Sequence, residues 1–174
     1  MNAGTVERGD GSFVQITYIS QEDKMKLLYK IEDINKLKKY ELAENTEIRS
    51  LKIPDDLFLL YLFHKDRKPD IVFNEKEMIE NYQQWYEKGC IYYILLVDER
   101  IVATAAIEKY SNDKWEAADV RVLRSERNKG YGKQIVYFVT KCILDHGITA
   151  TCYTEDDNIP MQKVINSLGF TPYE

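Results

Sequence analysis

The sequence predicts an α/β fold of the α+β type, in which helices flank a mixed, mostly antiparallel sheet. Several segments alternate apolar and polar residues, as half-buried strands do. Between them, apolar residues recur at helical spacing. Two strand-like segments are separated by only three polar residues, which is typical of an antiparallel hairpin. With 174 residues, 44% of them hydrophobic, the chain can bury a core of its own.

The first quarter of the chain is expected to form a strand followed by a helix. Ser12–Ser20 alternates apolar and polar residues, whereas Gln21–Asn45 carries apolar residues close to helical spacing. Because the pattern changes near residue 45, we expect an N-terminal extension, 1–45, packed on a domain, 46–174. The strand is expected to cover a sheet edge, either of its own chain or of a second subunit in a swapped homodimer.

The rest of the chain predicts strands and helices in alternation. A strand at 46–53 precedes a helix through 57–63, and Asn74 with Glu77 resembles a capping box that begins a second helix. Glycines at 89, 147 and 169 are natural helix ends. In order, the remaining predicted elements are the hairpin strands 91–97 and 101–110, a strand at 115–123, a helix that buries 135–143, a strand at 148–154 and a helix at 160–168.

Composition excludes several classes of function. The net charge of −5 disfavours binding to nucleic acid or to an anionic membrane, and no stretch approaches the roughly 18 apolar residues of a membrane span. Met1–Gly11 is polar and lacks an apolar signal core, and the three cysteines are dispersed without a CxxC pair. His64 and His146 have no companion at metal-ligand spacing. We therefore expect a cytoplasmic protein without a metal.

The strongest local signal is Arg127–Gly132 (RNKGYG), which lies between a strand and a helix. Residues 121–133 carry five positive side chains and one negative side chain. Two glycines let backbone N–H groups approach a ligand, and the helix start adds unpaired donors, so a diphosphate is the favoured ligand. The dinucleotide and Walker fingerprints do not fit, because Ile135 stands at the third glycine position and no Gly-Lys-Ser/Thr follows. The same residues are also compatible with a solvated glycine turn.

Val120–Lys133 resembles the acyl-coenzyme A signature of GCN5-related N-acetyltransferases (GNATs), in which Arg/Gln-x-x-Gly-x-Gly/Ala follows a strand. The second signature of that family is matched after the next strand, at Asn158, Met161, Val164, Ile165, Gly169 and Phe170. The resemblance extends over 91–170 and is closest to the branch related to glycine N-acyltransferases. It implies the GNAT-like acyl-CoA N-acyltransferase fold, acetyl-CoA as cosubstrate, and a small-molecule or peptide amine as acceptor.

The resemblance also implies roles for individual residues. In the family, the strand that here is 115–123 separates from its neighbour, so that backbone groups at Val120 and Val122 bind the pantetheine arm and one N–H polarises the thioester carbonyl. The amides of the glycine loop hold the diphosphate. The cofactor-binding residues implied in this way are Val120, Arg121, Val122, Arg127, Asn128, Lys129, Gly130, Tyr131, Gly132, Lys133 and Asn158.

The acceptor amine would attack directly, so it must lose a proton to a base. In the family a glutamate often stands eleven residues before the Arg/Gln of the first signature, and that position is Glu116. A strand glutamate that merely faces solvent is the alternative interpretation. Glu108 is another candidate, and Asp119 is a third, although strand alternation places Asp119 on the face opposite Glu116.

Two departures from the family pattern support a different function. The tyrosine that often protonates the leaving thiolate is replaced by Ile165, which leaves water, Tyr153 or Tyr131 for that step. The sequence also ends four residues after Phe170, where the family usually continues with further strands. A catalytically inactive acyl-CoA-binding sensor or partner module is therefore the alternative, and a nucleotide-binding regulator is a third interpretation.

Overall fold

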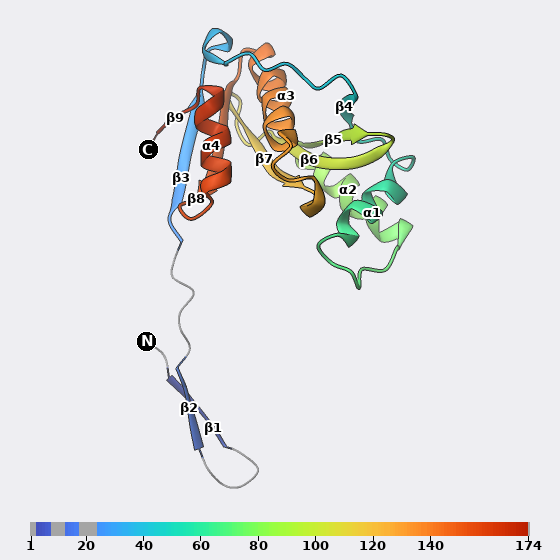
Figure 1. The fold of residues 1–174 in the computed structure, drawn as a ribbon, viewed down its shortest axis with the longest axis vertical. Helices are drawn as coiled ribbons and strands as arrows, with labels where there is room; N and C mark the ends of the chain where they lie inside the picture. The colour runs from blue at the N-terminus through green and yellow to red at the C-terminus, as the bar shows by residue number, and fades with distance from the viewer. Residues whose placement is uncertain (1–2, 8–12, 18–23, 174) are drawn as a thin grey trace.

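The computed structural model describes residues 3–7, 13–17 and 24–173, and its main body is built around one sheet (Figure 1). Seven strands follow the order β4-β5-β6-β7-β8-β3-β9. Every neighbouring pair is antiparallel except β7 and β8, which run parallel. The predicted mixed, mostly antiparallel sheet is thus confirmed. The strands are β3 (Lys26–Ile31), β4 (Thr46–Ser50), β5 (Cys90–Val97), β6 (Arg100–Glu108), β7 (Lys114–Val122), β8 (Thr149–Glu155) and β9 (Thr171–Pro172).

Helices cover both faces of this sheet. They are α1 (Leu57–Lys65), α2 (Glu75–Glu87), α3 (Tyr131–Asp145) and α4 (Ile159–Leu168), with short 3-10 turns η1 (Ile34–Lys36) and η2 (Arg124–Glu126). Successive strand residues point to opposite faces. On β5, Leu95 belongs to the large core that includes α3 and α4, whereas Ile94 and Leu96 belong to a smaller core with α1. The α3/α4 pair and the α1/α2 pair therefore lie on opposite faces.

Local chemistry explains the elements that the sequence predicts well. Asn74 caps α2, because its side chain accepts a hydrogen bond from the Glu77 amide at 3.2 Å. The Glu77 carboxylate does not reach back to the backbone as a capping box requires; it accepts from the Asn74 side-chain amide at 3.2 Å. Asp98 and Glu99 both have positive φ, 47° and 62°, as the tight turn of a two-residue hairpin needs.

The predicted helix over Gln21–Asn45 is wrong. Residues 26–31 form β3, which pairs antiparallel with β8 from Lys26 opposite Glu155 to Ile31 opposite Ala150. Tyr29 and Ile31 are buried beneath the helices, and Leu27 packs beside them. Alternation at Leu27, Tyr29 and Ile31 competes with helical spacing over the same few residues, and the pairing with β8 favours the strand.

The strand expected at Ser12–Ser20 is confirmed only over Phe13–Thr17, because residues 12 and 18–20 lie outside the described part. This strand, β2, pairs with β1 (Ala3–Glu7) in a separate two-stranded sheet. Covering an edge of the main sheet of its own chain is therefore not its role; β3 is the N-terminal segment that joins that sheet, between β8 and β9. Pairing with a second subunit and the boundary at residue 45 stay predictions.

Gly169 joins the end of α4 to the turn after β3. Its φ is +98°, and it ends α4 in the left-handed conformation. A Cβ at this position would collide with the carbonyl oxygen of Lys36 in η1. The Lys38 amide also donates to the Leu168 carbonyl at 3.0 Å. This contact fixes the chain that leaves β3 against the C-terminus of α4.

Candidate active site

The parallel strands β7 and β8 are paired over only part of their length. Their register covers three positions and ends with Glu116 opposite Thr151. On its other edge β7 stays with β6 to the end, and the Leu123 amide donates to the Val102 carbonyl at 2.9 Å. Because backbone groups alternate in direction along a strand, those of Val120 and Val122 point away from β6, into the side where β8 has separated.

A β-bulge interrupts β7 at the start of this open stretch. The register with β6 shifts between Thr104 and Ala106, so that Asp119 and Val120 both face the single residue Ala105. Asp119 has a φ of +46°, which is uncommon for a residue with a side chain. The bulge was not predicted, because a register shift depends on the partner strand.

The bulge also corrects the expected orientation of Asp119. Glu116 lies on the α1/α2 face, since the next residue, Ala117, is buried in the core beneath α3. Asp119 reaches that same face, where its carboxylate accepts from the Tyr92 hydroxyl at 3.4 Å and from Arg121 Nε at 2.7 Å. The ring of Tyr92 packs on Tyr82 of α2, with centroids 5.2 Å apart. The prediction that Asp119 lies opposite Glu116 is therefore wrong.

Glu116 lies next to a second carboxylate. Its cross-strand neighbour in β6 is Glu108, and both side chains are partly buried. Burial and the negative charge of Glu108 raise the pKa of Glu116 to about 7, while Lys26 opposes this shift. The pKa of Glu108 is also raised, first by burial and then by Asp119. A base is most efficient when its pKa lies near the working pH.

The loop before α3 forms a concave set of backbone donors. Asn128 and Gly130 both have positive φ, 64° and 88°, so the chain alternates its direction over a few residues. Gly130 is the N-cap of α3 and supplies no side chain, which leaves the N–H groups of the first turn without a side-chain partner. Such alternating backbone forms an anion-binding nest, to which the helix dipole adds positive potential.

The basic side chains around this loop differ in their partners. Arg121 is bound to Asp119, and Lys129 donates to Glu126 at 2.8 Å. Arg127 and Lys133 form no ion pair with any residue that the structure describes. The Lys133 ammonium lies 4.9 Å from the ring centre of Tyr40, a contact that the sequence did not predict. A loop and a helix start with these donors and charges can hold a diphosphate, and Gly130 keeps the approach free of a Cβ.

Residues 58–170 match the sequence model of the acetyltransferase (GNAT) family. The chain belongs to this family. The match covers more than half of the chain and includes both signatures, the strands β5 to β8, and the helices α2, α3 and α4. No curated protein matches the sequence.

Solved structures with the GNAT fold resemble this chain in architecture. A GNAT acetyltransferase from Colwellia psychrerythraea superposes with a TM-score of 0.65 at 22% identity, over 86% of this chain and 53% of that one. The ribosomal-protein-S18-alanine N-acetyltransferase of Escherichia coli gives 0.56 at 18%, over 74% and 79%. AAC(6')-Iy, in complex with the bisubstrate analogue CoA-S-monomethyl-acetylneamine, gives 0.58 at 20%, over 74% and 92%. The chain spans about half the length of the Colwellia protein.

The residues of the second GNAT signature contribute mainly to the structure of α4 and the core. Asn158 is exposed and caps α4, accepting from the Met161 amide at 3.3 Å, so its contact with a cofactor stays a prediction. Ile165 is fully buried in the large core, which leaves no hydroxyl at the position where many GNATs have a tyrosine. Of the two alternatives, Tyr131 begins α3 and packs on the core, whereas Tyr153 on β8 is 45% exposed.

A series of side-chain contacts links the bulge of this GNAT domain to the α1/α2 layer. The His64 Nε2 atom lies 3.2 Å from the Tyr82 hydroxyl, and Tyr82 packs on Tyr92, which bonds to Asp119. Burial lowers the pKa of His64 and raises that of Tyr82 to about 12, so both are neutral near pH 7. No local sequence pattern predicts these contacts, because the four residues come from four separate elements.

The described residues form neither a membrane-spanning helix nor a cluster of metal ligands. In the part of the chain that the structure describes, no helix is long and apolar enough to cross a membrane. Residues 3–7, 13–17 and 24–173 also contain no group of three His, Cys, Asp or Glu side chains arranged to hold a metal ion.

Proposed function

We propose that this GNAT chain is an N-acetyltransferase that moves the acetyl group of acetyl-CoA onto an amine by direct attack. The observation that carries the proposal is that Glu116, with a pKa of about 7, stands at the last paired position before β7 and β8 separate. The carboxylate takes a proton from the acceptor ammonium. The neutral nitrogen then forms a bond to the acetyl carbon and loses its second proton, the carbon–sulfur bond breaks, and the thiolate takes up a proton.

The chain can bind and orient acetyl-CoA through its backbone. The free groups of Val120 and Val122 suit an extended pantetheine arm, which would lie along β7 as an added strand. The nest at Asn128–Gly130 and the first turn of α3 suit the diphosphate. A Val120 N–H directed into the open side would polarise the thioester carbonyl.

Proton return to the thiolate does not need a residue at position 165. Tyr153 lies on β8 where that strand has left β7, and its partial exposure connects it with solvent. We propose that Tyr153 or water supplies this proton, since a coenzyme A thiol is acidic enough to leave through water. The acceptor is proposed to be a small-molecule or peptide amine, by analogy with the acceptors named for the similar structures.

A second candidate function is an acyl-CoA-binding module that does not turn over. Ile165, fully buried in place of the hydroxyl, is the observation that favours it. The two functions share the loop and differ in the use of Glu116. The raised pKa of Glu116 favours the enzyme, because a module that only binds acyl-CoA gains nothing from a carboxylate buried beside another carboxylate.

Two measurements separate these functions. Calorimetry with acetyl-CoA and with ATP should show binding of acetyl-CoA alone; preference for ATP would favour a nucleotide-binding regulator. Release of free thiol from acetyl-CoA is then followed with a panel of polyamines, aminoglycosides and peptides with free N-termini. Amine-dependent thiol release supports the transferase, whereas tight acetyl-CoA binding without release by any amine supports the sensor.

A further inference from the structure

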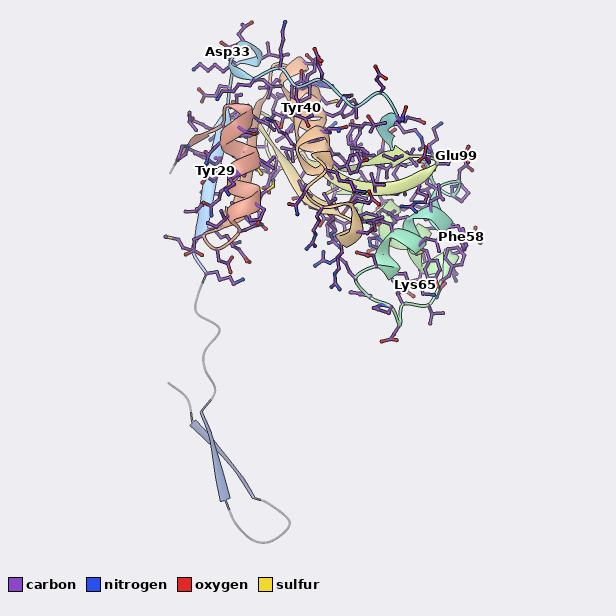
Figure 2. The ribbon with its side chains drawn as sticks, viewed as in Figure 1. Tyr29, Asp33, Tyr40, Phe58, Lys65 and Glu99 are labelled. Atoms are coloured by element: carbon purple, nitrogen blue, oxygen red, sulfur yellow. The ribbon has the colours of Figure 1, made fainter. Side chains whose placement is uncertain are left out.

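Tyr40 belongs to a segment that lies outside the matched GNAT region and crosses α3. The segment is held at both ends. The Lys38 amide donates to the Leu168 carbonyl at 3.0 Å, and Thr46 begins β4, which pairs with β5 opposite Val97. Between these contacts, the Tyr40 ring packs against Tyr137 of α3, with centroids 6.3 Å apart. Figure 2 labels Tyr40 on this crossing segment.

The Tyr40 hydroxyl reaches the start of α3. It lies so near Gly130 that a Cβ on that glycine would stand 2.9 Å from the hydroxyl oxygen. Gly130 is also the N-cap of α3 and the second left-handed residue of the nest. A phenol O–H is a hydrogen-bond donor, and here it stands beside the backbone donors of the loop.

The Tyr40 ring also positions a cation at the same place. The Lys133 ammonium lies 4.9 Å from its ring centre, within the range of a cation–π contact. Lys133 belongs to the first turn of α3 and forms no ion pair among the described residues. One aromatic side chain therefore brings a hydroxyl donor and an ammonium to the entrance of the nest.

We infer that Tyr40 is part of the acyl-CoA site, where its hydroxyl donates to the diphosphate and its ring orients Lys133. The inference rests on the proposed function, because it assumes that the nest holds a diphosphate. The chain thus adds a donor from its N-terminal region to a loop that lies in the matched family region. Tyr40 is a binding residue in this account and takes no part in proton transfer.

The test compares Tyr40→Phe, Tyr40→Ala and the control Tyr137→Phe by calorimetry with coenzyme A. A hydrogen bond to a charged group contributes roughly 1.5–3 kcal/mol, which is about 10- to 100-fold in affinity. Tyr40→Phe should weaken binding about 10-fold, and Tyr40→Ala more, because Lys133 also loses its ring. Tyr137→Phe removes a hydroxyl from the neighbouring ring and should leave the affinity unchanged. Melting temperatures check that all variants fold.

A second ligand locates the contact. Dephospho-coenzyme A lacks the 3'-phosphate and keeps the diphosphate, so Tyr40→Phe should weaken both ligands by the same factor. Loss restricted to coenzyme A would assign Tyr40 to the 3'-phosphate and overturn the inference. Unchanged or tighter binding by Tyr40→Phe would also overturn it, and tighter binding would show that the hydroxyl obstructs the ligand. If the unaltered protein binds neither ligand, the proposed function itself fails.

Discussion

The two edges of β8 differ in how far they are paired. Toward β3, pairing runs from Ala150 to Glu155, whereas toward β7 it stops after Thr151. The β3 edge buries Tyr29 and Ile31, and the β7 edge opens beside Glu116 and leads to the glycine loop. The same strand thus has a closed edge, where β3 continues the sheet, and an open edge, which lies beside the proposed ligand site.

In the proposed mechanism Glu116 is the base at the open edge, and neutralising this carboxylate should have the largest effect. Glu116→Gln should lower turnover roughly 10²–10⁴-fold near neutral pH, because the amine loses its base. Affinity for acetyl-CoA should stay the same in calorimetry. Glu99→Gln, the same substitution in the hairpin turn, is the matched control. A fall of only a few fold would move the base to Glu108 or to water.

We expect coenzyme A binding at the open edge to depend on Gly130. Gly130→Val should weaken coenzyme A binding at least about 100-fold, because the side chain fills the nest and meets the Tyr40 hydroxyl, and valine tolerates the left-handed backbone poorly. Gly147→Val is the control, since Gly147 also has positive φ, +72°, but nothing lies near its added Cβ. It shares the backbone strain without touching the loop. Equal affinities of the two variants would exclude the nest as the diphosphate site.

Gly132→Val should lower the melting temperature of the ligand-free protein less than Gly130→Val does. Gly132 does not have the left-handed backbone, and its added Cβ would make only ordinary contact, 3.4 Å, with a Val122 methyl group. Any loss of coenzyme A affinity at this position therefore reports directly on the space between the backbone and the ligand.

The closed edge should determine stability. Deleting residues 1–45 removes β3 from between β8 and β9 and exposes the core that Tyr29 and Ile31 cover. Each buried side chain of this size contributes roughly 1.5–3 kcal/mol, so the melting temperature should fall by more than about 10 °C. Deleting residues 1–23 removes only β1 and β2 and should leave it unchanged. A stable domain that begins at Thr46 would show that the closed edge is dispensable.

A substitution beside Glu116 should shift the pH dependence of turnover without abolishing turnover. Glu108→Gln removes a negative charge beside Glu116 and so lowers the pKa of Glu116. Burial is the larger cause and remains, so the acid limb of the pH–rate profile should move down by less than about one pH unit. Glu99→Gln should not move it. An upward shift would show that Glu108 does not act through its charge.

Much of the open edge could be predicted from the sequence because its signals are local. The glycine loop, the helix after it, the tight hairpin turn and Glu116 at a fixed distance from Arg127 each lie within one continuous stretch. The closed edge could not, because Leu27, Tyr29 and Ile31 satisfy two periodicities until β8 is known to be their partner. The bulge at Asp119 and the approach of Tyr40 to Gly130 depend on contacts between distant segments, which no spacing along the chain reveals.

The pH dependence of turnover tests the central claim most directly, which is that Glu116 accepts the proton of the attacking amine. The free carboxylate is required, and its pKa of about 7 places the change in the range that a buffer series covers. We predict that kcat/KM for the best amine falls about tenfold per pH unit below pH 7, and that the break near pH 7 is lost in Glu116→Gln, whose kcat/KM keeps rising through pH 8 with the fraction of unprotonated amine. A wild-type profile that stays flat from pH 7 to pH 5, or an identical break in Glu116→Gln, would contradict the account.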